Sequence, residues 1–257
     1  MSNVIEVKNL VKTFGHKARW FASSDHEVQA VKSVSLHLAA GETLAIVGES
    51  GSGKSTLARM LVGLETPTSG SITLMGKARP QDAKALGRTI QYVFQDPVAS
   101  LNPRKTIADI LAVPLNHLCG YPAAQRKTRM LELMEAVQMP ADALLGYPHE
   151  FSGGQAQRLA IARALAAEAR ILVLDEPVSA LDVSVQAQVL LLLDQLKKHF
   201  GLSYLFISHD LAVVESIADR VAVMYRGEWV ECEQNEVLFG TPKHSYTQTL
   251  LASAPRL

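Results

Sequence analysis

Alternating apolar and polar residues predict strands near the beginning of the chain. The alternation surrounds Ile5 and Val7 and returns from Val28 to Leu38, as expected of strands with one face in a core. The segment Ile72–Leu74 predicts another strand after a turn that contains proline and glycine. We expect these strands to be antiparallel. Residues 15–27 are polar and irregular, which predicts a loop or a hairpin insertion.

Short continuous aliphatic runs predict a second kind of strand, buried on both faces as in a parallel sheet. They are Leu44–Val47, Ile171–Leu174 and Tyr204–Ile207. Between the last two runs, apolar residues at helical spacing predict a helix that ends at Gly201. Strand, helix and strand in this order predict a right-handed parallel crossover. An amphipathic helix is also predicted after the first run, from Leu57, Met60, Leu61 and Leu64.

The segment from Pro97 to Glu150 has a different character, because it is rich in leucine, alanine and methionine. Its pattern predicts helices at 106–118 and 123–138. We expect proline and glycine to interrupt this block at Pro103, Pro114, Gly120 and Pro122. Its methionines are interpreted as core residues, namely Met130, Met134 and Met139.

Composition narrows the class of protein. The 257 residues are 48% hydrophobic, which is ample for a core, and their formal net charge is zero at neutral pH. This balance gives no broad electrostatic footprint for nucleic acid, so we expect no nucleic-acid partner. The two cysteines suit a reducing compartment. No apolar run approaches the roughly 20 residues that span a bilayer, and the N-terminus lacks a secretory signal, so we expect a cytoplasmic protein.

A glycine-rich segment, GESGSGKST, follows the first aliphatic run. A strand, a loop of this kind and a helix form the context of a phosphate-binding loop. Glycines let the backbone N–H groups point at an anion, and the helix N-terminus adds a favourable dipole. Lys54 supplies a charge for the outer phosphates, and the Ser55 hydroxyl suits Mg²⁺. The predicted nucleotide-binding residues of this loop are Gly48, Glu49, Ser50, Gly51, Ser52, Gly53, Lys54, Ser55 and Thr56.

Polar residues also follow the other two aliphatic runs, and ligands of open parallel sheets bind beyond the carboxyl ends of the strands. Asp175 and Glu176 follow one run, and Ser208, His209 and Asp210 follow the other. We predict that Asp175 holds Mg²⁺ and that Glu176 reaches a water aimed at the γ-phosphate. We predict that His209 contacts the γ-phosphate or orients that water. A single carboxylate at such a place could instead cap a helix.

These segments and several further motifs resemble those of ABC-transporter ATPases. FSGGQAQRLAIARAL, at residues 151–165, resembles the signature motif of that family. VFQDP, LDEP, SALD and SHD occur in the family's order, so the resemblance covers essentially the whole chain. It implies ATP and Mg²⁺ as cofactors, and hydrolysis of ATP to ADP and phosphate coupled to transport across a membrane. The implied fold is α/β, a P-loop NTPase with a RecA-like parallel-sheet core, an antiparallel β-subdomain and a helical subdomain.

The resemblance assigns roles to individual residues. Gln95 corresponds to the Q-loop residue that senses Mg²⁺ and faces the membrane partner. The implied catalytic residues are Glu176, His209, Gln95 and Lys54, and the implied metal ligands are Ser55, Gln95 and Asp175. Phe14 is implied to stack on adenine, with Trp20 as the alternative, although either ring could simply pack. The implied signature and D-loop residues are Ser152, Gly153, Gly154 and Gln155, and Ser179 to Asp182.

The family's architecture divides the single ATPase domain at residues 1–257 into parts. Residues 1–96 and 160–257 are expected to form the core and the β-subdomain, and residues 97–159 the helical subdomain with the signature. In the family, the signature addresses ATP on a second ABC ATPase subunit, so that two chains arranged head to tail bury two ATP molecules. ATP binding then favours the closed pair, and hydrolysis removes that preference.

Longer segments resemble the peptide/nickel importer branch of the family, in particular its F-type ATPase. They are YPHEFSGGQ, QDPVASLNPRKT, DEPVSALDVSVQAQVL and PKHSYTQTLL. The implied partners are a second, different ATPase, two transmembrane permease subunits and an extracytoplasmic solute-binding protein, although the isolated chain could self-associate. The implied location is peripheral, on the cytoplasmic face of the inner or plasma membrane. Some members carry cysteines for an iron–sulfur cluster; this chain, read to Leu257, lacks them, and we expect no cluster.

The cargo stays open between di- or oligopeptides, nickel and a metal chelate, because the partner subunits select it. Two other functions for an ABC ATPase remain as alternatives. One is driving a membrane machine that moves no solute, which the branch-specific segments disfavour. The other is action on nucleic acid or the ribosome, which the neutral charge balance does not support.

Overall fold

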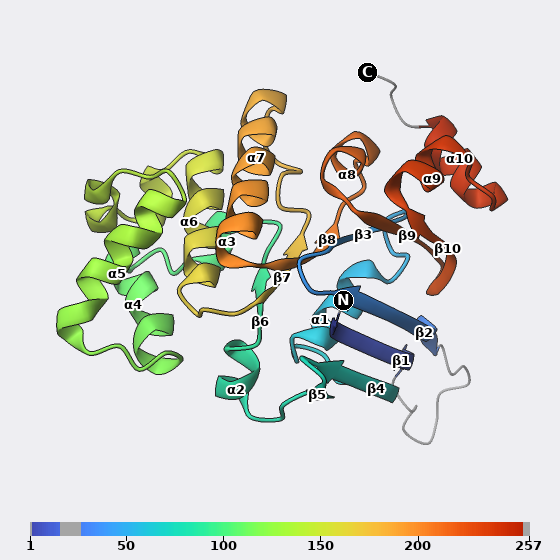
Figure 1. The fold of residues 1–257 in the computed structure, drawn as a ribbon, viewed down its shortest axis with the longest axis horizontal. Coiled ribbons are helices and arrows are strands. Elements are labelled where there is room, and N and C mark those ends of the chain that lie inside the picture. Colours follow the sequence, from blue (N-terminus) through green and yellow to red (C-terminus); the bar gives the residue numbers. More distant parts are fainter. Residues whose placement is uncertain (1, 16–26, 254–257) are drawn as a thin grey trace, which may run out of the picture.

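The computed structural model describes residues 2–15 and 27–253, and within them it contains two β-sheets flanked by helices (Figure 1). The smaller sheet has the strand order β2–β1–β4–β5, with antiparallel neighbours throughout. Its strands are β1 (Asn3–Phe14), β2 (Val28–Ala39), β4 (Ser69–Leu74) and β5 (Lys77–Ala78). The alternating patterns therefore predicted the three longer strands and their direction correctly. The insertion that contains Trp20 and Phe21 lies outside the described residues.

The larger sheet has the strand order β10–β9–β3–β8–β7–β6. Its strands are β3 (Thr43–Val47), β6 (Ile90–Val93), β7 (Ile171–Asp175), β8 (Ser203–Ile207), β9 (Arg220–Tyr225) and β10 (Glu228–Gln234). All neighbours are parallel except β10, which pairs with β9 in the antiparallel sense. The three aliphatic runs form β3, β8 and β7 side by side, which confirms the predicted parallel core. Because parallel strands end at the same edge, the polar residues after them meet there.

The helices cover the larger sheet and form a lobe beyond its β6 end. They are α1 (Lys54–Leu61), α2 (Ala83–Gly87), α3 (Pro97–Ser100), α4 (Ile107–His117), α5 (Ala123–Ala136), α6 (Gly153–Leu165), α7 (Val183–Phe200), α8 (Leu211–Ile217), α9 (Asn235–Gly240) and α10 (Ser245–Ser253), with 3₁₀ helices η1 (Ala141–Leu145) and η2 (Pro148–Glu150). In Figure 1, α4 and α5 lie at one end of the molecule and α9 and α10 at the other. None of the helices in the described ranges has both the length and the apolar character that a membrane span requires.

Two details of the helix predictions were wrong. The helix after the phosphate loop ends at Leu61, and Leu64 lies beyond it with 57% of its surface exposed. Gly63, in the left-handed conformation at φ 79°, follows that end and turns the chain away. Pro114 does not interrupt a helix but lies inside α4. An interior proline removes one backbone hydrogen bond and crowds the preceding turn. Pro114 is buried on the same face as Leu111, and this burial offsets part of that cost.

Helix α6 bears on the proposed division into subdomains. It runs without a break from Gly153 to Leu165, so the proposed border at residues 159–160 falls within one helix. It also contacts both sides, since it packs on α3, α4 and α5 and on strand β6. The helix that begins at the signature turn therefore packs on the parallel-sheet core as well as on the helical lobe.

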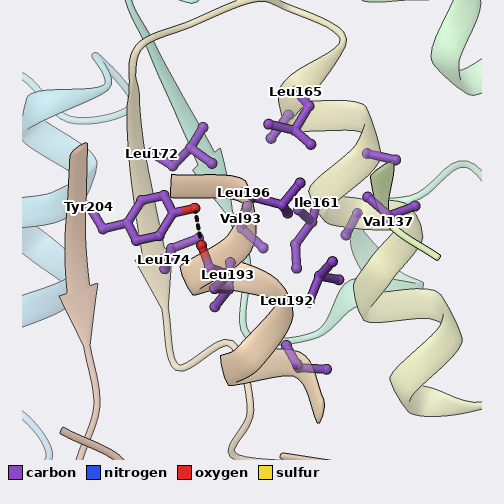
Figure 2. Close-up of a cluster of buried hydrophobic side chains, with 14 of the residues drawn as sticks. Val93, Val137, Ile161, Leu165, Leu172, Leu174, Leu192, Leu193, Leu196 and Tyr204 are labelled. Carbon is purple, nitrogen blue, oxygen red and sulfur yellow. Dashed lines mark hydrogen bonds between the residues drawn. The ribbon is translucent and has the colours of Figure 1, made fainter. Parts of the chain in front are cut away.

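Successive side chains of a strand point to opposite faces of the sheet, so the larger sheet has a separate hydrophobic core on each face. Leu172, Leu174 and Tyr204 face α6 and α7, where they meet Ile161 and Leu193 (Figure 2). The residues between them, such as Val173 and Leu205, face α1 and the smaller sheet. Each fully buried leucine or isoleucine contributes about 1.5–3 kcal/mol relative to an exposed one. The three methionines of the helical lobe are buried with the first core, as predicted.

One polar group is enclosed in the first core. The Tyr204 side chain is fully buried, and its hydroxyl donates a hydrogen bond of 2.8 Å to the Leu193 carbonyl of α7 (Figure 2). Burial raises the pKa of this phenol, so it stays neutral near pH 7. The bond links β8 to α7 and satisfies the hydroxyl where no water reaches it.

We predict that Tyr204→Phe lowers the free energy of unfolding by about 1 kcal/mol, because the variant loses this bond but keeps the ring. Urea unfolding followed by circular dichroism measures the change. Leu191→Ala is the control: Leu191 lies on α7 with 66% of its surface exposed, so its loss should change stability by less than about 0.5 kcal/mol. Equal stability of Tyr204→Phe and the wild type would contradict the prediction.

Candidate functional site

The loop between β3 and α1 has a backbone that only glycine allows at two positions. Gly48 has φ 146° and Gly53 has φ 107°, both in the region that disfavours other residues. A Cβ atom on Gly48 would lie 2.1 Å from the Met224 carbonyl oxygen, and one on Gly53 would lie 2.3 Å from that of Ala30. Because α1 begins at Lys54, the loop ends at the positive end of a helix dipole. This local structure, two left-handed glycines before a helix N-terminus, is compatible with the anion-binding loop that the glycine pattern predicts.

Lys54 is folded back over this loop. Its Nζ donates hydrogen bonds to the carbonyl oxygens of Gly48, at 2.7 Å, and Glu49, at 2.8 Å. Only 6% of its surface is exposed. Burial lowers the pKa of Lys54, although the carboxylates of Glu176, Asp175 and Glu49 oppose that shift. An approaching phosphate adds negative charge beside the ammonium and therefore favours its charged form.

Asp175 ends β7 with both carboxylate oxygens occupied. Its Oδ1 accepts a hydrogen bond of 3.2 Å from the Ser55 hydroxyl, and its Oδ2 accepts one from the Tyr92 hydroxyl of β6. Only 7% of Asp175 is exposed. Burial and the neighbouring carboxylate raise the pKa of Tyr92, which keeps it a donor. The hydroxyl and carboxylate oxygens of Ser55 and Asp175 are hard ligands of the kind that Mg²⁺ prefers, so this pair fits the ion.

Glu176 lies between two other predicted site residues. Its Oε2 accepts a hydrogen bond of 2.8 Å from the Gln95 side-chain amide, and its Oε1 lies 3.1 Å from His209 Nδ1. Its backbone is in the left-handed conformation at φ 49°, which is uncommon for a glutamate. The backbone N–H of Glu176 donates to the Ile207 carbonyl at 2.9 Å, which fixes this strained turn to β8. Strain of this kind is typical of functional positions.

These groups surround one cavity of about 560 Å³. Its lining consists of Ala30, Ser50, Gly51, Gly53, Lys54, Ser55, Thr56, Gln95, Glu176 and His209. The fold thus brings residues from four separate motifs to one place, although they are up to 159 positions apart in sequence, from Ser50 to His209. Gly48, Glu49 and Ser52 belong to the loop but are not among the lining residues. Asp175 does not line the cavity either, but it contacts Ser55, which does.

Other predicted site residues lie elsewhere. Within the described part of the chain, the cavity lining includes neither Phe14 nor any of Ser152–Gln155, nor Asp182. Phe14 ends β1 with 41% of its surface exposed, and the Lys12 ammonium lies 4.7 Å from its ring centre. Stacking of Phe14 on adenine stays a prediction. Trp20 lies outside the described residues.

The signature turn forms the exposed N-terminus of α6. Ser152 caps the helix, since its Oγ accepts a hydrogen bond from the Gln155 N–H at 3.4 Å, and its own N–H donates to the Gln155 side chain at 3.0 Å. Gly154 has no room for a side chain, because a Cβ atom would lie 2.4 Å from Val185 of α7. Asp182 caps α7 in turn, and bonds from Ser184 and Val185 lower its pKa. The turn is therefore an exposed helix N-terminus, a place where helix-terminal donors and the dipole favour an anion.

Sequence reasoning missed two contacts of the site. Tyr92 lies in β6, whose four residues show too short a pattern to predict a strand. Tyr246 of α10 accepts a hydrogen bond from the Glu49 N–H at 3.2 Å, across 197 positions of sequence. Neither residue belongs to a short motif with a chemical rationale, so only the tertiary structure reveals them.

The loop, its buried lysine and the acidic strand ends define the class of protein: a phosphate-loop nucleoside triphosphatase. The family model described as "ABC transporter" matches residues 31–179. The chain is 46% identical to the oligopeptide transport ATP-binding protein AppF of Bacillus subtilis, over 98% of this chain and 78% of that protein. It is 52% identical to the dipeptide transport ATP-binding protein DppF of Haemophilus influenzae, over 90% of this chain and 72% of that protein.

A solved structure agrees with the sequence matches. The dimeric ATP-binding cassette MJ0796, determined in a post-hydrolysis state with ADP and Pi, superposes with a TM-score of 0.76 at 30% identity. The match covers 90% of this chain and 98% of that one. The chain belongs to the ABC transporter family and is an ATPase of that family. The predicted family and fold class are confirmed.

We predict that Tyr92→Phe lowers kcat for ATP hydrolysis about tenfold. The variant removes the donor that orients Asp175, and a hydrogen bond to a charged group contributes about 1.5–3 kcal/mol. Binding of ADP without Mg²⁺ should stay unchanged, because the phosphate loop is intact. Phosphate release and an ADP titration measure the two quantities. The control is Tyr121→Phe, which removes a hydroxyl bonded to Glu168 away from the cavity; equal rates in the two variants would refute the role of Tyr92.

Proposed function

We propose that this chain is the ATP-hydrolysing motor subunit of an importer for di- or oligopeptides. The arrangement of Gln95, Glu176 and His209 beside the phosphate loop carries the hydrolytic part of the proposal. The names of AppF and DppF, an oligopeptide and a dipeptide transport ATP-binding protein, support the peptide cargo. Nickel or a metal chelate remains the alternative cargo, which the sequence of this chain does not distinguish.

In the proposed reaction a water attacks the γ-phosphorus of ATP. The bond between that phosphorus and the β–γ bridging oxygen breaks, so ADP and phosphate leave. Glu176 accepts a proton from the attacking water, and Gln95 and His209, which touch its two oxygens, hold the carboxylate in place. Lys54 and the N-terminus of α1 balance the charge of the outer phosphates. The electrostatic stabilisation acts in a partly desolvated cavity, where it is stronger than in bulk water.

Ser55, Gln95 and Asp175 are the residues that we propose to hold Mg²⁺. The oxygen-rich donor set and the 3.2 Å contact between Ser55 and Asp175 support this assignment. When bound there, Mg²⁺ would neutralise charge on the β- and γ-phosphates. Tyr92 keeps Asp175 oriented toward Ser55 through its bond to the other carboxylate oxygen.

We predict that Glu176→Gln retains ATP affinity within about twofold but lowers turnover at least 100-fold, because it removes only the proton acceptor. Nucleotide titration and phosphate release measure the two effects. Lys54→Ala is the contrasting variant, since it should weaken ATP binding itself. Hydrolysis by Glu176→Gln at the wild-type rate would show that another group accepts the proton.

A second ABC ATPase subunit completes the site in this proposal. The helix-terminal donors of Ser152, Gly153, Gly154 and Gln155 lie outside the lining of the chain's own cavity, which supports a role on nucleotide held by another subunit. That MJ0796 was solved as a dimer gives further support. Two ATP molecules would then lie between two chains, and differential binding of about 5.5 kcal/mol would shift the pair from mostly open to mostly closed.

We predict that Ser152→Arg spares ATP binding by the single chain but abolishes ATP-dependent dimer formation in the Glu176→Gln background. The bulky cation occupies the surface that must approach a partner. Size-exclusion chromatography with light scattering, with and without ATP, measures the association. Arg104→Ala, on the exposed loop before α4, is the control and should leave dimerisation intact. Closure of the Ser152→Arg variant would contradict action of the signature across an interface.

Membrane partners follow from the same proposal. A groove of about 520 Å³ lies next to β6 and is lined by residues including Leu64, Arg79, Leu86, Phe94 and Arg163. Phe94 directly precedes Gln95, so a permease segment seated in this groove would be coupled to the hydrolytic residues. We propose two transmembrane permease subunits, an extracytoplasmic solute-binding protein, and a peripheral location on the cytoplasmic face of the membrane.

A further inference from the structure

The C-terminal part of the chain supports the phosphate loop from outside. The Met224 carbonyl of β9 fills the space beside Gly48. The N–H of Gly227, in the turn between β9 and β10, donates a hydrogen bond of 2.9 Å to the Ser52 carbonyl. The third contact comes from α10, where the Tyr246 hydroxyl accepts the hydrogen bond of 3.2 Å from the Glu49 N–H. Elements more than 170 residues downstream of the loop therefore hold its outer side.

The folded C-terminal segment places Tyr246 independently of the loop. The Glu231 carboxylate of β10 accepts hydrogen bonds from the backbone N–H groups of Lys243, at 2.8 Å, and His244, at 3.0 Å, just before α10. Thr247, the next residue after Tyr246, is fully buried. The Tyr246 ring packs on Tyr225 at the end of β9, with ring centres 4.1 Å apart. The hydroxyl thus reaches the loop from a fixed scaffold.

The peptide that Tyr246 contacts also anchors the lysine. The Glu49 N–H that binds Tyr246 belongs to the peptide between Gly48 and Glu49. The carbonyl of that peptide, on Gly48, accepts a hydrogen bond of 2.7 Å from Lys54 Nζ. The next carbonyl, that of Glu49, accepts a second hydrogen bond from Lys54 Nζ at 2.8 Å. The same carbonyl accepts the Ser52 N–H at 3.2 Å, which closes the turn. Fixing the peptide between Gly48 and Glu49 therefore fixes the adjoining turn and the resting place of the ammonium. Preorganisation of this kind improves affinity because ligand binding need not order the loop.

We propose that Tyr246 is a positioning residue for nucleotide binding: through its hydroxyl, α10 holds the phosphate loop in the form that accepts ATP. The inference rests on the proposed nucleotide site. It assigns a role to the segment PKHSYTQTLL that the ATPase motifs leave unexplained. Displacement of α10 therefore weakens nucleotide binding through the backbone of Glu49, although Tyr246 itself does not line the cavity.

The test compares Tyr246→Phe with Tyr225→Phe in the full chain. Each variant removes one hydroxyl from the same pair of rings, and the Tyr225 hydroxyl has no hydrogen-bond partner among the described residues. Titrations with ATP and with ADP, steady-state kinetics and thermal unfolding without nucleotide are measured for both. Hydrogen exchange of the peptide that contains Glu49 reports directly on the loop.

For Tyr246→Phe we expect affinity for both nucleotides to fall about three- to tenfold, as for loss of one hydrogen bond. KM for ATP should rise while kcat at saturating ATP stays within about twofold, and the Glu49 amide should exchange faster. Tyr225→Phe should match the wild type in all of these. The two variants should have equal melting temperatures without nucleotide, which separates loop positioning from general stability.

Two results would overturn the inference alone while the wild type binds ATP normally. One is unchanged affinity and exchange in Tyr246→Phe. The other is an equal loss of affinity in both variants, which would assign the effect to ring packing. Failure of the wild-type chain to bind ATP would instead overturn the proposed site and this inference together.

Discussion

The turn between Gly48 and Gly53 is the constraint on which the rest of the structure depends. Its backbone is sterically closed to side chains at both glycines, because carbonyl groups of β2 and β9 occupy the space that a Cβ atom would need. Further contacts from Gly227 and Tyr246 hold the turn from outside. The loop is therefore shaped by distant parts of the chain before any ligand arrives. Because the loop is already ordered, phosphate binding does not have to offset the entropy lost on ordering it, and the affinity is higher.

The parallel sheet explains why the remaining chemistry gathers at this turn. Strands β3, β7 and β8 are neighbours and end at one edge, so Lys54, Glu176 and His209 follow them into the same cavity. The signature turn starts α6 instead, and its residues are not among those that line that cavity. Under the proposed function, one chain thus contributes a phosphate loop to one ATP and helix-terminal donors to another. Because the nucleotide binds the associated subunits better than the separate ones, its binding favours their association.

Sequence reasoning found the parts of this arrangement that repeat a strong local pattern. Aliphatic runs identified β3, β7 and β8, because burial on both faces restricts these strands to apolar residues. Glycine spacing identified the loop, because its backbone conformation excludes other residues at two positions. Short or mixed elements, such as β6 and the β9–β10 hairpin, show no comparably clear pattern of apolar residues. The bonds of Tyr92 to Asp175 and of Tyr246 to Glu49 join residues far apart in sequence. From the sequence alone, a tyrosine at either position would be interpreted as a packing residue. Only the tertiary structure shows the hydrogen bond that its hydroxyl makes.

Cryo-electron microscopy of the complete transporter, trapped with ATP and the Glu176→Gln chain, tests the central claim most directly. The account predicts triphosphate density between the phosphate loop of this chain and the signature turn of the second ATPase, with Ser152–Gln155 of this chain against the other nucleotide. Nucleotide bound to the loop at Lys54 in a complex whose signature turns face only solvent would contradict it.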